Sequence, residues 1–336
     1  MRIAILAPIA WRTPPRKYGP WEQVASTLTE GLVKRGIDVT LFATGDSLTQ
    51  ANLRYSAPRG YAENPDMDPK VEECLHISQV MESADKFDLI HNHFDFLPLS
   101  FSRLISKPMI TTIHGFSSPK IIPVYKKYND TCAYVSISNA DRSPELDYLA
   151  TVYNGIDVSQ FEYVENPDDY LLYFGRIHPE KGPHTAIEVA RRTGRRLILA
   201  GLVQDEHYFA TDVSPYIDGS QIQYVGNVGP EERSQLLGNA AALLHLINFE
   251  EPFGLSVAEA MLCGTPVIAF DRGSMSELIL HGETGFLSSH VDQVIRFIDQ
   301  LPSISRARCA QWAHEQFSQD RMVDRYIEVY KELLHR

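Results

Sequence analysis

The residues from Glu251 to Phe270, EPFGLSVAEAMLCGTPVIAF, predict a loop, a helix and a buried strand in succession. Pro252 and Gly254 are typical of the loop, apolar residues follow at helical spacing, and Gly264 ends the helix before a β-branched and aromatic run. A helix that starts beside Gly254 has first N–H groups without partners and a positive dipole end. The stretch therefore predicts an α/β fold with an anion site of the phosphate kind.

Two carboxylates bracket this helix start. Glu251 lies in the predicted loop and Glu259 lies in the predicted helix, with seven residues between them. A diphosphate bound at the amides of Phe253, Gly254 and Leu255 would leave hydroxyl-rich groups at the two carboxylates. The arrangement suits a nucleotide sugar, and an ordinary turn with two surface glutamates is the alternative.

Length and charge limit the classes of protein to consider. A chain of 336 residues is long for one domain and sufficient for two hydrophobic cores. The net charge of -12 argues against nucleic acid as a partner and gives no general attraction to anionic lipid. A local basic patch, formed by Arg12, Arg16 and Lys17, is the one candidate exception. Four scattered cysteines without metal-type spacing, and no apolar run of transmembrane length, favour a reduced, cytoplasmic protein.

Alternating strand and helix patterns predict two Rossmann-like halves. We expect a first domain over residues 1–157, joined by a C-terminal helix at about 318–336, and a second domain over residues 158–317. Residues 52–69 are expected to form a polar loop, and residues 151–157 a strand and turn. The other predicted strands are Arg2–Pro8, Asp38–Thr44, Phe87–Phe94, Met109–His114, Ala133–Ile137, Tyr170–Gly175, Arg196–Gly201, Ile222–Asn227 and Ala241–Leu246.

The run EPFGLSVAEAMLCGTPVIA resembles the C-terminal signature of glycosyltransferase family 4. The resemblance covers nearly the whole chain and is weakest between residues 50 and 85. It implies a GT-B fold, in which two Rossmann-like domains face an interdomain cleft and the C-terminal helix crosses back to the first domain. It also implies transfer of a sugar from a nucleoside diphosphate donor with retention at the anomeric carbon.

A basic turn follows the first strand of the second half. The residues from Gly175 to Gly182, GRIHPEKG, place Arg176 and Lys181 around a turn before a helix. Taken alone, this favours a solvated basic turn. The resembled family has the same G-R-x-x-x-x-K-G pattern, and the resemblance implies that Arg176 and Lys181 neutralise the donor diphosphate.

The resemblance also assigns residues of the first half. It implies that His114, in the context T-x-H-G, lies over the donor sugar as a catalytic residue, whereas a satisfied strand-end histidine is the alternative. Gly19 matches the family's glycine loop, and the resemblance implies that its backbone contacts the donor diphosphate. Pro20 replaces a second glycine and removes an N–H donor, so no such contact is expected at position 20. His91 and His93 have no family counterpart, and a metal pair is conceivable at their spacing.

The donor contacts in the second half complete the expected site. Glu251 is expected to contact the transferred sugar as the second catalytic residue, and its alternative role, nucleophile of a double displacement, stays open. Glu259 is expected to accept hydrogen bonds from the ribose, and the resemblance implies that Val228 helps to hold the nucleobase through backbone atoms. No metal or other cofactor is expected, because Arg176, Lys181 and helix amides would carry the diphosphate charge. Asp66 and Asp68 have a metal-type spacing but lie in a turn-rich loop.

The predicted function is therefore a retaining hexosyltransferase. UDP-glucose is the first expectation for the donor and GDP-mannose the second. The acceptor is expected to be a saccharide or a lipid-linked oligosaccharide at the cytoplasmic membrane face, where Arg12, Arg16 and Lys17 are a candidate peripheral contact. The alternatives are a nucleotide-sugar epimerase of GT-B fold and a non-catalytic binder. A nicotinamide dehydrogenase is disfavoured, because no G-x-G-x-x-G follows the first strand.

Overall fold

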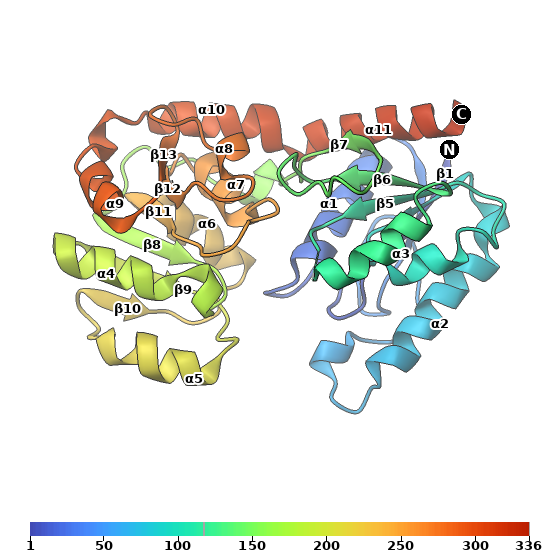
Figure 1. The fold of residues 1–336 in the computed structure, drawn as a ribbon, viewed down its shortest axis with the longest axis horizontal. Helices are drawn as coiled ribbons and strands as arrows, with labels where there is room; N and C mark the ends of the chain where they lie inside the picture. Colours follow the sequence, from blue (N-terminus) through green and yellow to red (C-terminus); the bar gives the residue numbers. More distant parts are fainter. Residues whose placement is uncertain (117, 336) are drawn as a thin grey trace. The chain divides into compact units, whose positions relative to one another are not determined.

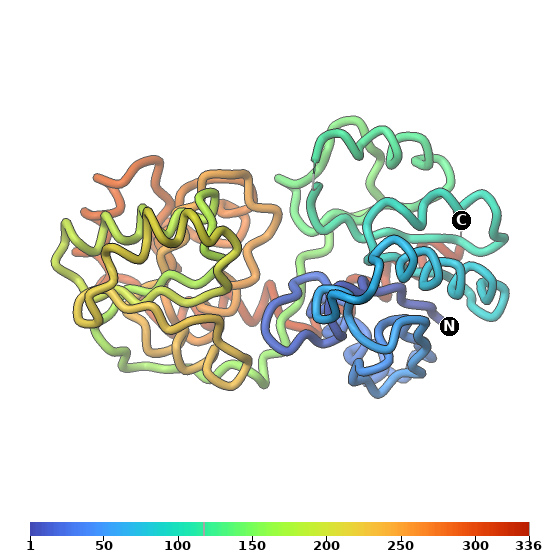
Figure 2. Tube along the Cα trace, turned by 90° about the horizontal axis from the view of Figure 1, so that it is seen from below, coloured from blue at the N-terminus to red at the C-terminus, as the bar shows by residue number. Residues whose placement is uncertain are grey.

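The computed structural model describes residues 1–116 and 118–335. The chain divides into two compact units, which are considered one at a time (Figure 1). The first comprises Met1–Gly155 and Gln319–Arg336, and the second comprises Ile156–Ser318. Both chain ends therefore belong to the same unit, as the blue and red ends of the trace show (Figure 2).

The first unit is built on a parallel sheet of seven strands in the order β3-β2-β1-β4-β5-β6-β7. The order reverses direction between β1 and β4, as it does in a Rossmann sheet, and ligands of such sheets bind at the carboxyl ends of the strands beside this point. The central strands are buried along most of their length, which their apolar sequences explain. The strands are β1 (Arg2–Leu6), β2 (Asp38–Phe42), β3 (Asn52–Arg54), β4 (Leu89–Asn92), β5 (Met109–Ile113), β6 (Cys132–Ser136) and β7 (Tyr148–Thr151).

Helices α1 (Pro20–Lys34), α2 (Pro69–Glu82), α3 (Ile122–Lys127) and α11 (Gln319–His335) complete this unit. Pro20 and Pro69 each open a helix, where the missing N–H of proline removes no hydrogen bond. Asp68, which the sequence places in a loop, is the N-cap of α2 and accepts a hydrogen bond from Lys70 N at 2.9 Å.

Helix α11 packs against α1 although nearly three hundred residues separate them. Its apolar face, Met322, Val323, Tyr326, Val329 and Tyr330, is buried. The side-chain amide of Gln319 donates to Thr27 O at 2.7 Å. Gly31 permits the close approach, because a Cβ there would lie 2.4 Å from Val323 Cγ2. The C-terminal residues are thus part of the core of the N-terminal unit.

The second unit repeats the arrangement with six parallel strands in the order β10-β9-β8-β11-β12-β13. The reversal lies between β8 and β11, so their carboxyl ends mark the expected ligand position of this unit. The strands are β8 (Tyr170–Phe174), β9 (Arg196–Ala200), β10 (Ile222–Tyr224), β11 (Ala242–His245), β12 (Val267–Phe270) and β13 (Gly285–Ser288). The helices are α4 (Pro183–Thr193), α5 (Glu206–Tyr208), α6 (Pro230–Gly238), α7 (Leu255–Leu262), α8 (Met275–Leu278), α9 (Val291–Ile298) and α10 (Arg306–Phe317).

Two local predictions differ from the structure. The expected loop at residues 52–69 contains the short edge strand β3, which pairs with β2 from Thr40 and Asn52 onward. The last strand of the first unit is β7 and not the segment 151–157, of which only Thr151 lies in the strand. Both strands are short and lie at edges of the sheet, where tertiary pairing outweighs the local sequence pattern.

The first unit ends at Gly155, where residue 157 was expected, and the C-terminal return begins at Gln319, where about 318 was expected. Among the described residues, no helix is both long enough and apolar enough to cross a membrane.

Candidate active site

The predicted site residues of the second unit, apart from Val228, lie in the loops and the helix that follow β8 and β11. Arg176 and Lys181 lie between β8 and α4, and Glu251 lies between β11 and α7. Because β8 and β11 are adjacent parallel strands, both connections leave the same edge of the sheet. The site thus occupies the point of reversal at which α/β sheets bind their ligands.

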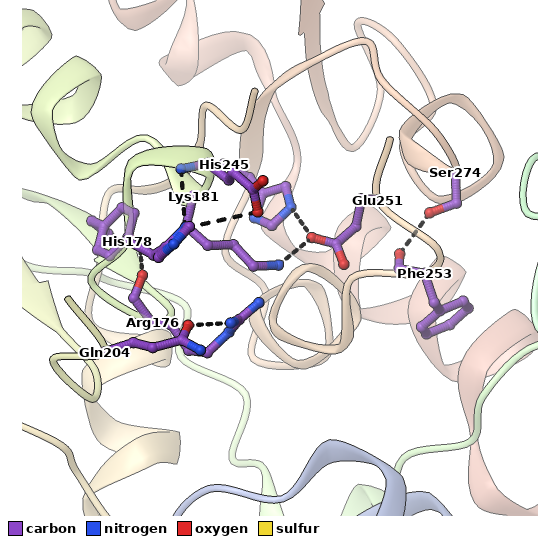
Figure 3. Close-up of polar contacts among 10 residues, drawn as sticks. Arg176, His178, Lys181, Gln204, His245, Glu251, Phe253 and Ser274 are labelled. Carbon is purple, nitrogen blue, oxygen red and sulfur yellow. Dashed lines mark hydrogen bonds and ion pairs between the residues drawn. The ribbon is translucent and has the colours of Figure 1, made fainter. Parts of the chain in front are cut away.

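Lys181 and Glu251 form a largely buried ion pair, with 2.7 Å between Nζ and Oε2 (Figure 3). His245, the last residue of β11, also points at this carboxylate, and its Nε2 lies 3.3 Å from the same Oε2 without meeting hydrogen-bond geometry. The Lys181 ammonium further lies over the Phe249 ring, 4.4 Å from its centroid. Oε1 of Glu251 accepts no hydrogen bond from the described residues and is the oxygen available to a ligand.

These neighbours determine the charge state of Glu251. Burial acts to raise the pKa of this carboxyl, but the attraction of Lys181, together with His245, outweighs it and lowers the pKa from 4.5 to about 2. Glu251 is therefore ionised throughout the neutral range. A charged carboxylate can accept hydrogen bonds from sugar hydroxyls but has no proton to donate.

The shift predicts how stability depends on pH. Because the folded pKa of Glu251 lies below its unfolded value, its contribution is fully present above about pH 5 and is lost as pH falls toward 2. We expect Glu251→Gln to lower the free energy of unfolding by on the order of 3 kcal/mol at pH 7, with the gap to wild type closing in acid.

The measurement is calorimetric unfolding of both proteins between pH 7 and pH 3. Glu231→Gln, which changes an exposed carboxylate of α6, is the control. A gap between wild type and Glu251→Gln that stays constant over this range would contradict the assigned ion pair.

Arg176 lies beside the same turn, held by partners that sequence patterns did not indicate. Its Nη1 donates to Gln204 Oε1 (Figure 3), and the Tyr173 hydroxyl donates to the Arg176 carbonyl at 2.5 Å. Gln204 follows β9, so it meets Arg176 only because β9 pairs with β8. Arg176 and Lys181 thus lie at opposite ends of one turn, as the basic pattern predicted, and their side chains bond to different partners, Gln204 and Glu251.

Helix α7 begins where the sequence predicts it. Gly254 is its N-cap with φ of 87°, a left-handed conformation that favours glycine. The loop before it is fixed from behind: Ser274 N donates to Glu251 O at 2.9 Å, and Ser274 Oγ donates to Phe253 O at 2.8 Å. The Phe253 ring is buried against Phe317 at 5.7 Å between centroids, so the loop contributes backbone rather than this side chain to a ligand. The N–H of Leu255, as the first helical residue, has no carbonyl partner within the helix.

Glu259 has a cationic partner that the sequence analysis did not identify. Arg233 of α6 donates to Glu259 Oε1 at 3.1 Å, and the carboxylate is almost fully buried. The Arg233 guanidinium also lies 5.8 Å from the centre of the Phe174 ring. Its position in an acidic, polar helix carried no sequence signal. The role of Glu259 toward a ribose stays a prediction.

Val228 lies between β10 and α6, two residues before the helix starts. Its side chain is buried. A ligand that meets this loop would therefore meet backbone atoms, as the sequence analysis expected. The contact with a nucleobase stays a prediction.

The first unit holds Gly19 and His114. Gly19 is the N-cap of α1 with φ of 152°, and a Cβ there would lie 2.8 Å from Pro15 Cβ. Pro20 occupies the first helical position, so a proline in place of the family's second glycine is compatible with the helix.

Glu22, in the first turn of α1, is buried. Its carboxylate accepts a hydrogen bond from Trp11 N at 3.2 Å, and burial raises the pKa of this carboxyl to about 7.

His114 follows β5 and stacks on Trp21 of α1, with 5.6 Å between ring centroids. Its Nε2 lies 2.9 Å from His93 Nδ1. Burial lowers the pKa of His114 to about 3, so the imidazole is neutral at physiological pH. The contact between His114 and Trp21 thus joins the end of β5 to the start of α1, the helix that follows β1.

A metal pair at His91 and His93 finds no support in the geometry. His91 Nδ1 lies 2.7 Å from the Tyr330 hydroxyl and Nε2 lies 2.7 Å from Thr112 Oγ1, so both ring nitrogens have partners. In the described parts of the chain, no group of three or more His, Cys, Asp or Glu residues is arranged to hold a metal ion. The expectation of a metal-independent reaction stays a prediction.

Comparisons with known families define the class. Residues 157–313 match the family model described as glycosyl transferases group 1, and residues 21–160 match that of glycosyltransferase family 4. With two parallel α/β units, these matches define a glycosyltransferase of GT-B fold. More narrowly, the chain belongs among the glycosyltransferases of the family 4 type and is a transferase enzyme.

Individual relatives agree with this class. The chain is 22% identical to an uncharacterized glycosyltransferase of Methanocaldococcus jannaschii, over 98% of each chain. It is 26% identical to the N-acetyl-alpha-D-glucosaminyl L-malate synthase of Bacillus anthracis, over 76% of this chain and 78% of the relative. The solved structure of HepE from Anabaena in complex with UDP superposes with a TM-score of 0.77 at 19% identity, covering 99% and 100% of the two chains. This last likeness shows the fold.

Proposed function

We propose that the protein transfers a hexose from a nucleoside diphosphate sugar to a saccharide or lipid-linked glycan, with retention at the anomeric carbon. The observation that carries the proposal is the buried Lys181–Glu251 pair at the reversal point of the second sheet. It places a cation and an ionised carboxylate next to the start of α7, where backbone N–H groups are open. Diphosphate and sugar hydroxyls are the two chemistries that these groups recognise.

The diphosphate is assigned to Arg176, Lys181 and the amides at the start of α7. As the glycosidic bond breaks, negative charge develops on the leaving diphosphate, and fixed donors stabilise it most in the transition state. Lys181 is already neutralised by Glu251 when no donor is bound. A bound diphosphate would therefore share the Lys181 ammonium with Glu251, so that one cation interacts with both the phosphate and the sugar-binding carboxylate.

Glu251 is proposed to accept hydrogen bonds from the transferred sugar through Oε1. The other oxygen is occupied by Lys181 and faces His245. A nucleophile in a double displacement would need a carboxylate free to reach the anomeric carbon, and an ion pair within a fixed loop disfavours that role. We therefore propose front-face attack, in which a phosphate oxygen of the donor takes the proton of the acceptor.

UDP-glucose is the first proposal for the donor and GDP-mannose the second. HepE of Anabaena, which shares the fold, has been solved with UDP and glucose and with UDP-glucose. The Val228 side chain does not select the base, because it is buried and the loop offers backbone atoms.

The positive charge of Arg12, Arg16 and Lys17 indicated a contact with an anionic lipid carrier, but the ion pairs and hydrogen bonds of the two arginines weaken that proposal. Arg16 already pairs with Asp46 at 3.2 Å and with Glu63 at 3.5 Å. Arg12 Nε donates to Pro14 O at 3.0 Å. Both arginines therefore already have partners within the first unit, and a soluble saccharide is the acceptor that we propose first.

The test is calorimetric binding of UDP, GDP, UDP-glucose and GDP-mannose, each with and without EDTA. We expect micromolar binding of one nucleotide that is unchanged by EDTA, because protein cations replace the metal. No binding of any of the four would overturn the proposal. Binding that EDTA abolishes would overturn the metal-independent clamp alone.

Product analysis then separates the remaining activities. Release of UDP that depends on an added saccharide, with an α-linked product from an α-linked donor, is expected of a retaining transferase. Conversion of the nucleotide sugar to its epimer without any acceptor would instead identify an epimerase. Tight binding without turnover toward a panel of saccharides and water would identify a binder.

A further inference from the structure

The first unit contains a row of three buried histidines, which ends at His114, the residue expected to contact the transferred sugar. His91 and His93 come from the end of β4, and His114 comes from the end of the neighbouring strand β5. The ring centroids lie 4.1 Å apart for His91 and His93, and 5.1 Å apart for His93 and His114. His91 and His93 are fully buried, and His114 is nearly so.

The far end of the row is anchored. Both nitrogens of His91 have partners, the Tyr330 hydroxyl and Thr112 Oγ1, and Thr112 Oγ1 in turn lies 2.6 Å from the Tyr326 hydroxyl. The two tyrosines come from α11. The His91 ring is thus held by hydrogen bonds at both nitrogens, and its contact with the His93 ring limits rotation of His93.

The hydrogen bond between His93 and His114 can have two directions. In the first, His93 Nδ1–H donates to His114 Nε2, and His114 carries its own proton on Nδ1. In the second, His114 Nε2–H donates to His93 Nδ1, and His93 must carry its proton on Nε2. His93 Nε2 is buried and has no hydrogen-bond partner among the described residues.

The second direction is the costlier one. It would leave a buried N–H donor of His93 without an acceptor, and such orphaned N–H groups are rare in folded proteins. The first direction leaves only an unshared lone pair in the same place. Burial also lowers the pKa of both His93 and His114, so both rings are neutral and each carries one proton, on either Nδ1 or Nε2.

We infer that His93 is a positioning residue that holds His114 as the tautomer protonated on Nδ1, so that His114 presents an N–H donor to the transferred sugar. For the identity of the ligand, a sugar hydroxyl oxygen, the inference rests on the proposed function together with the expectation from the sequence analysis that His114 contacts the transferred sugar. The direction of the hydrogen bond rests on the geometry alone. Trp21, stacked on the His114 ring, limits its rotation and so helps to aim that donor.

Two substitutions of His93 test the inference. His93→Asn retains an amide at the position of Nδ1 and can still donate to His114 Nε2. His93→Leu removes the donor. The matched control is His76→Leu, which removes another fully buried histidine of the first unit, bonded through Nε2 to Ala7 O at 2.9 Å.

The direct readout is the nitrogen chemical shift of His114 in protein labelled with ¹⁵N-histidine, assigned by the signal lost in His114→Gln. We expect a protonated Nδ1 and an unprotonated Nε2 in wild type, in His93→Asn and in His76→Leu. In His93→Leu no donor faces Nε2, so we expect Nε2 to stay unprotonated, to lose its hydrogen bond, and to shift toward the position of a free unprotonated imidazole nitrogen. A wild-type His114 protonated on Nε2, or a His93→Leu spectrum identical to wild type, would overturn the inference.

The kinetic readout separates positioning from folding. In His93→Leu we expect kcat with the best nucleotide sugar to fall about tenfold, with recovery in His93→Asn, because one oriented hydrogen bond is lost from the transition state. Affinity for UDP, which lacks the sugar, should not change. Equal losses for UDP and for the nucleotide sugar would indicate a structural role and overturn the inference. If wild type transfers no sugar, the proposed function fails, while the nitrogen shifts still decide the tautomer.

Discussion

Lys181→Ala is expected to abolish most sugar transfer and to destabilise the second unit. The ammonium neutralises a buried carboxylate at 2.7 Å and is assigned to the donor diphosphate. Removal of one fixed transition-state donor typically lowers kcat by about a hundredfold or more. Loss of one partner of a buried pair leaves the other charge uncompensated, which we expect to cost about 3 kcal/mol. Steady-state transfer rates and calorimetric unfolding measure the two effects.

The double variant Lys181→Ala/Glu251→Gln separates the two losses. It removes the uncompensated charge, so we expect stability to recover while affinity for UDP remains as low as in Lys181→Ala. UDP affinity is the proper readout, because Glu251 is assigned to the sugar and not to the diphosphate. Recovery of UDP affinity together with stability would show that Lys181 acts only through folding. Arg192→Ala, at an exposed pair on α4, is the control for removal of a cation and should change little.

Gly182→Ala is expected to destabilise the second unit strongly and to weaken donor binding. Gly182 caps the start of α4 with φ of 71°, and a Cβ there would lie 2.0 Å from Leu246 O. The left-handed conformation costs a non-glycine residue about 1–2 kcal/mol. The collision with backbone adds roughly 1–3 kcal/mol. Because the turn that moves carries Lys181, we expect donor affinity to fall as well.

Gly194→Ala is the matched control for Gly182→Ala. Gly194 ends the same helix with nearly the same φ, 68°, but nothing lies within 4 Å of the added Cβ. Gly194→Ala should therefore show only the conformational cost, with donor binding unchanged. Calorimetric unfolding and UDP titration of both variants make the comparison. Equal losses of stability in the two would mean that the close approach of the turn to Leu246 is not present in solution.

Secondary structure near the site was readable because the local signals are strong. Helix α7 and strand β12 lie where the glycine, the apolar spacing and the β-branched run of residues 251–270 predict them. The turn with Arg176 and Lys181 follows a buried strand, as expected. The edge strand β3 and the position of β7 were missed, because three or four residues at an edge are selected by the partner strand and not by their own pattern.

The partners of the site residues could not be read from the sequence. Gln204 meets Arg176 across the paired strands β8 and β9, and Arg233 meets Glu259 across the neighbouring helices α6 and α7. His245 faces Glu251 from the end of the strand that precedes it. Of these partners, only His245 could have been suspected from the sequence, because a histidine at the end of a buried apolar strand is unusual. A spacing pattern reports residues on one element, whereas the contacts of Gln204 and Arg233 join side chains of different elements that only packing brings together.

The sequence by itself determined the class of this protein, its two α/β halves and the candidate residues for a diphosphate and a sugar. These depend on local spacing: a glycine that opens a helix, a cation at each end of a turn, and a carboxylate on either side of a helix start. Only the tertiary structure decided that Lys181 neutralises Glu251, that His93 faces His114, and that α11 supplies the tyrosines behind them. Charge state and tautomer depend on burial and on neighbours distant in the chain, and folding alone brings those neighbours within reach.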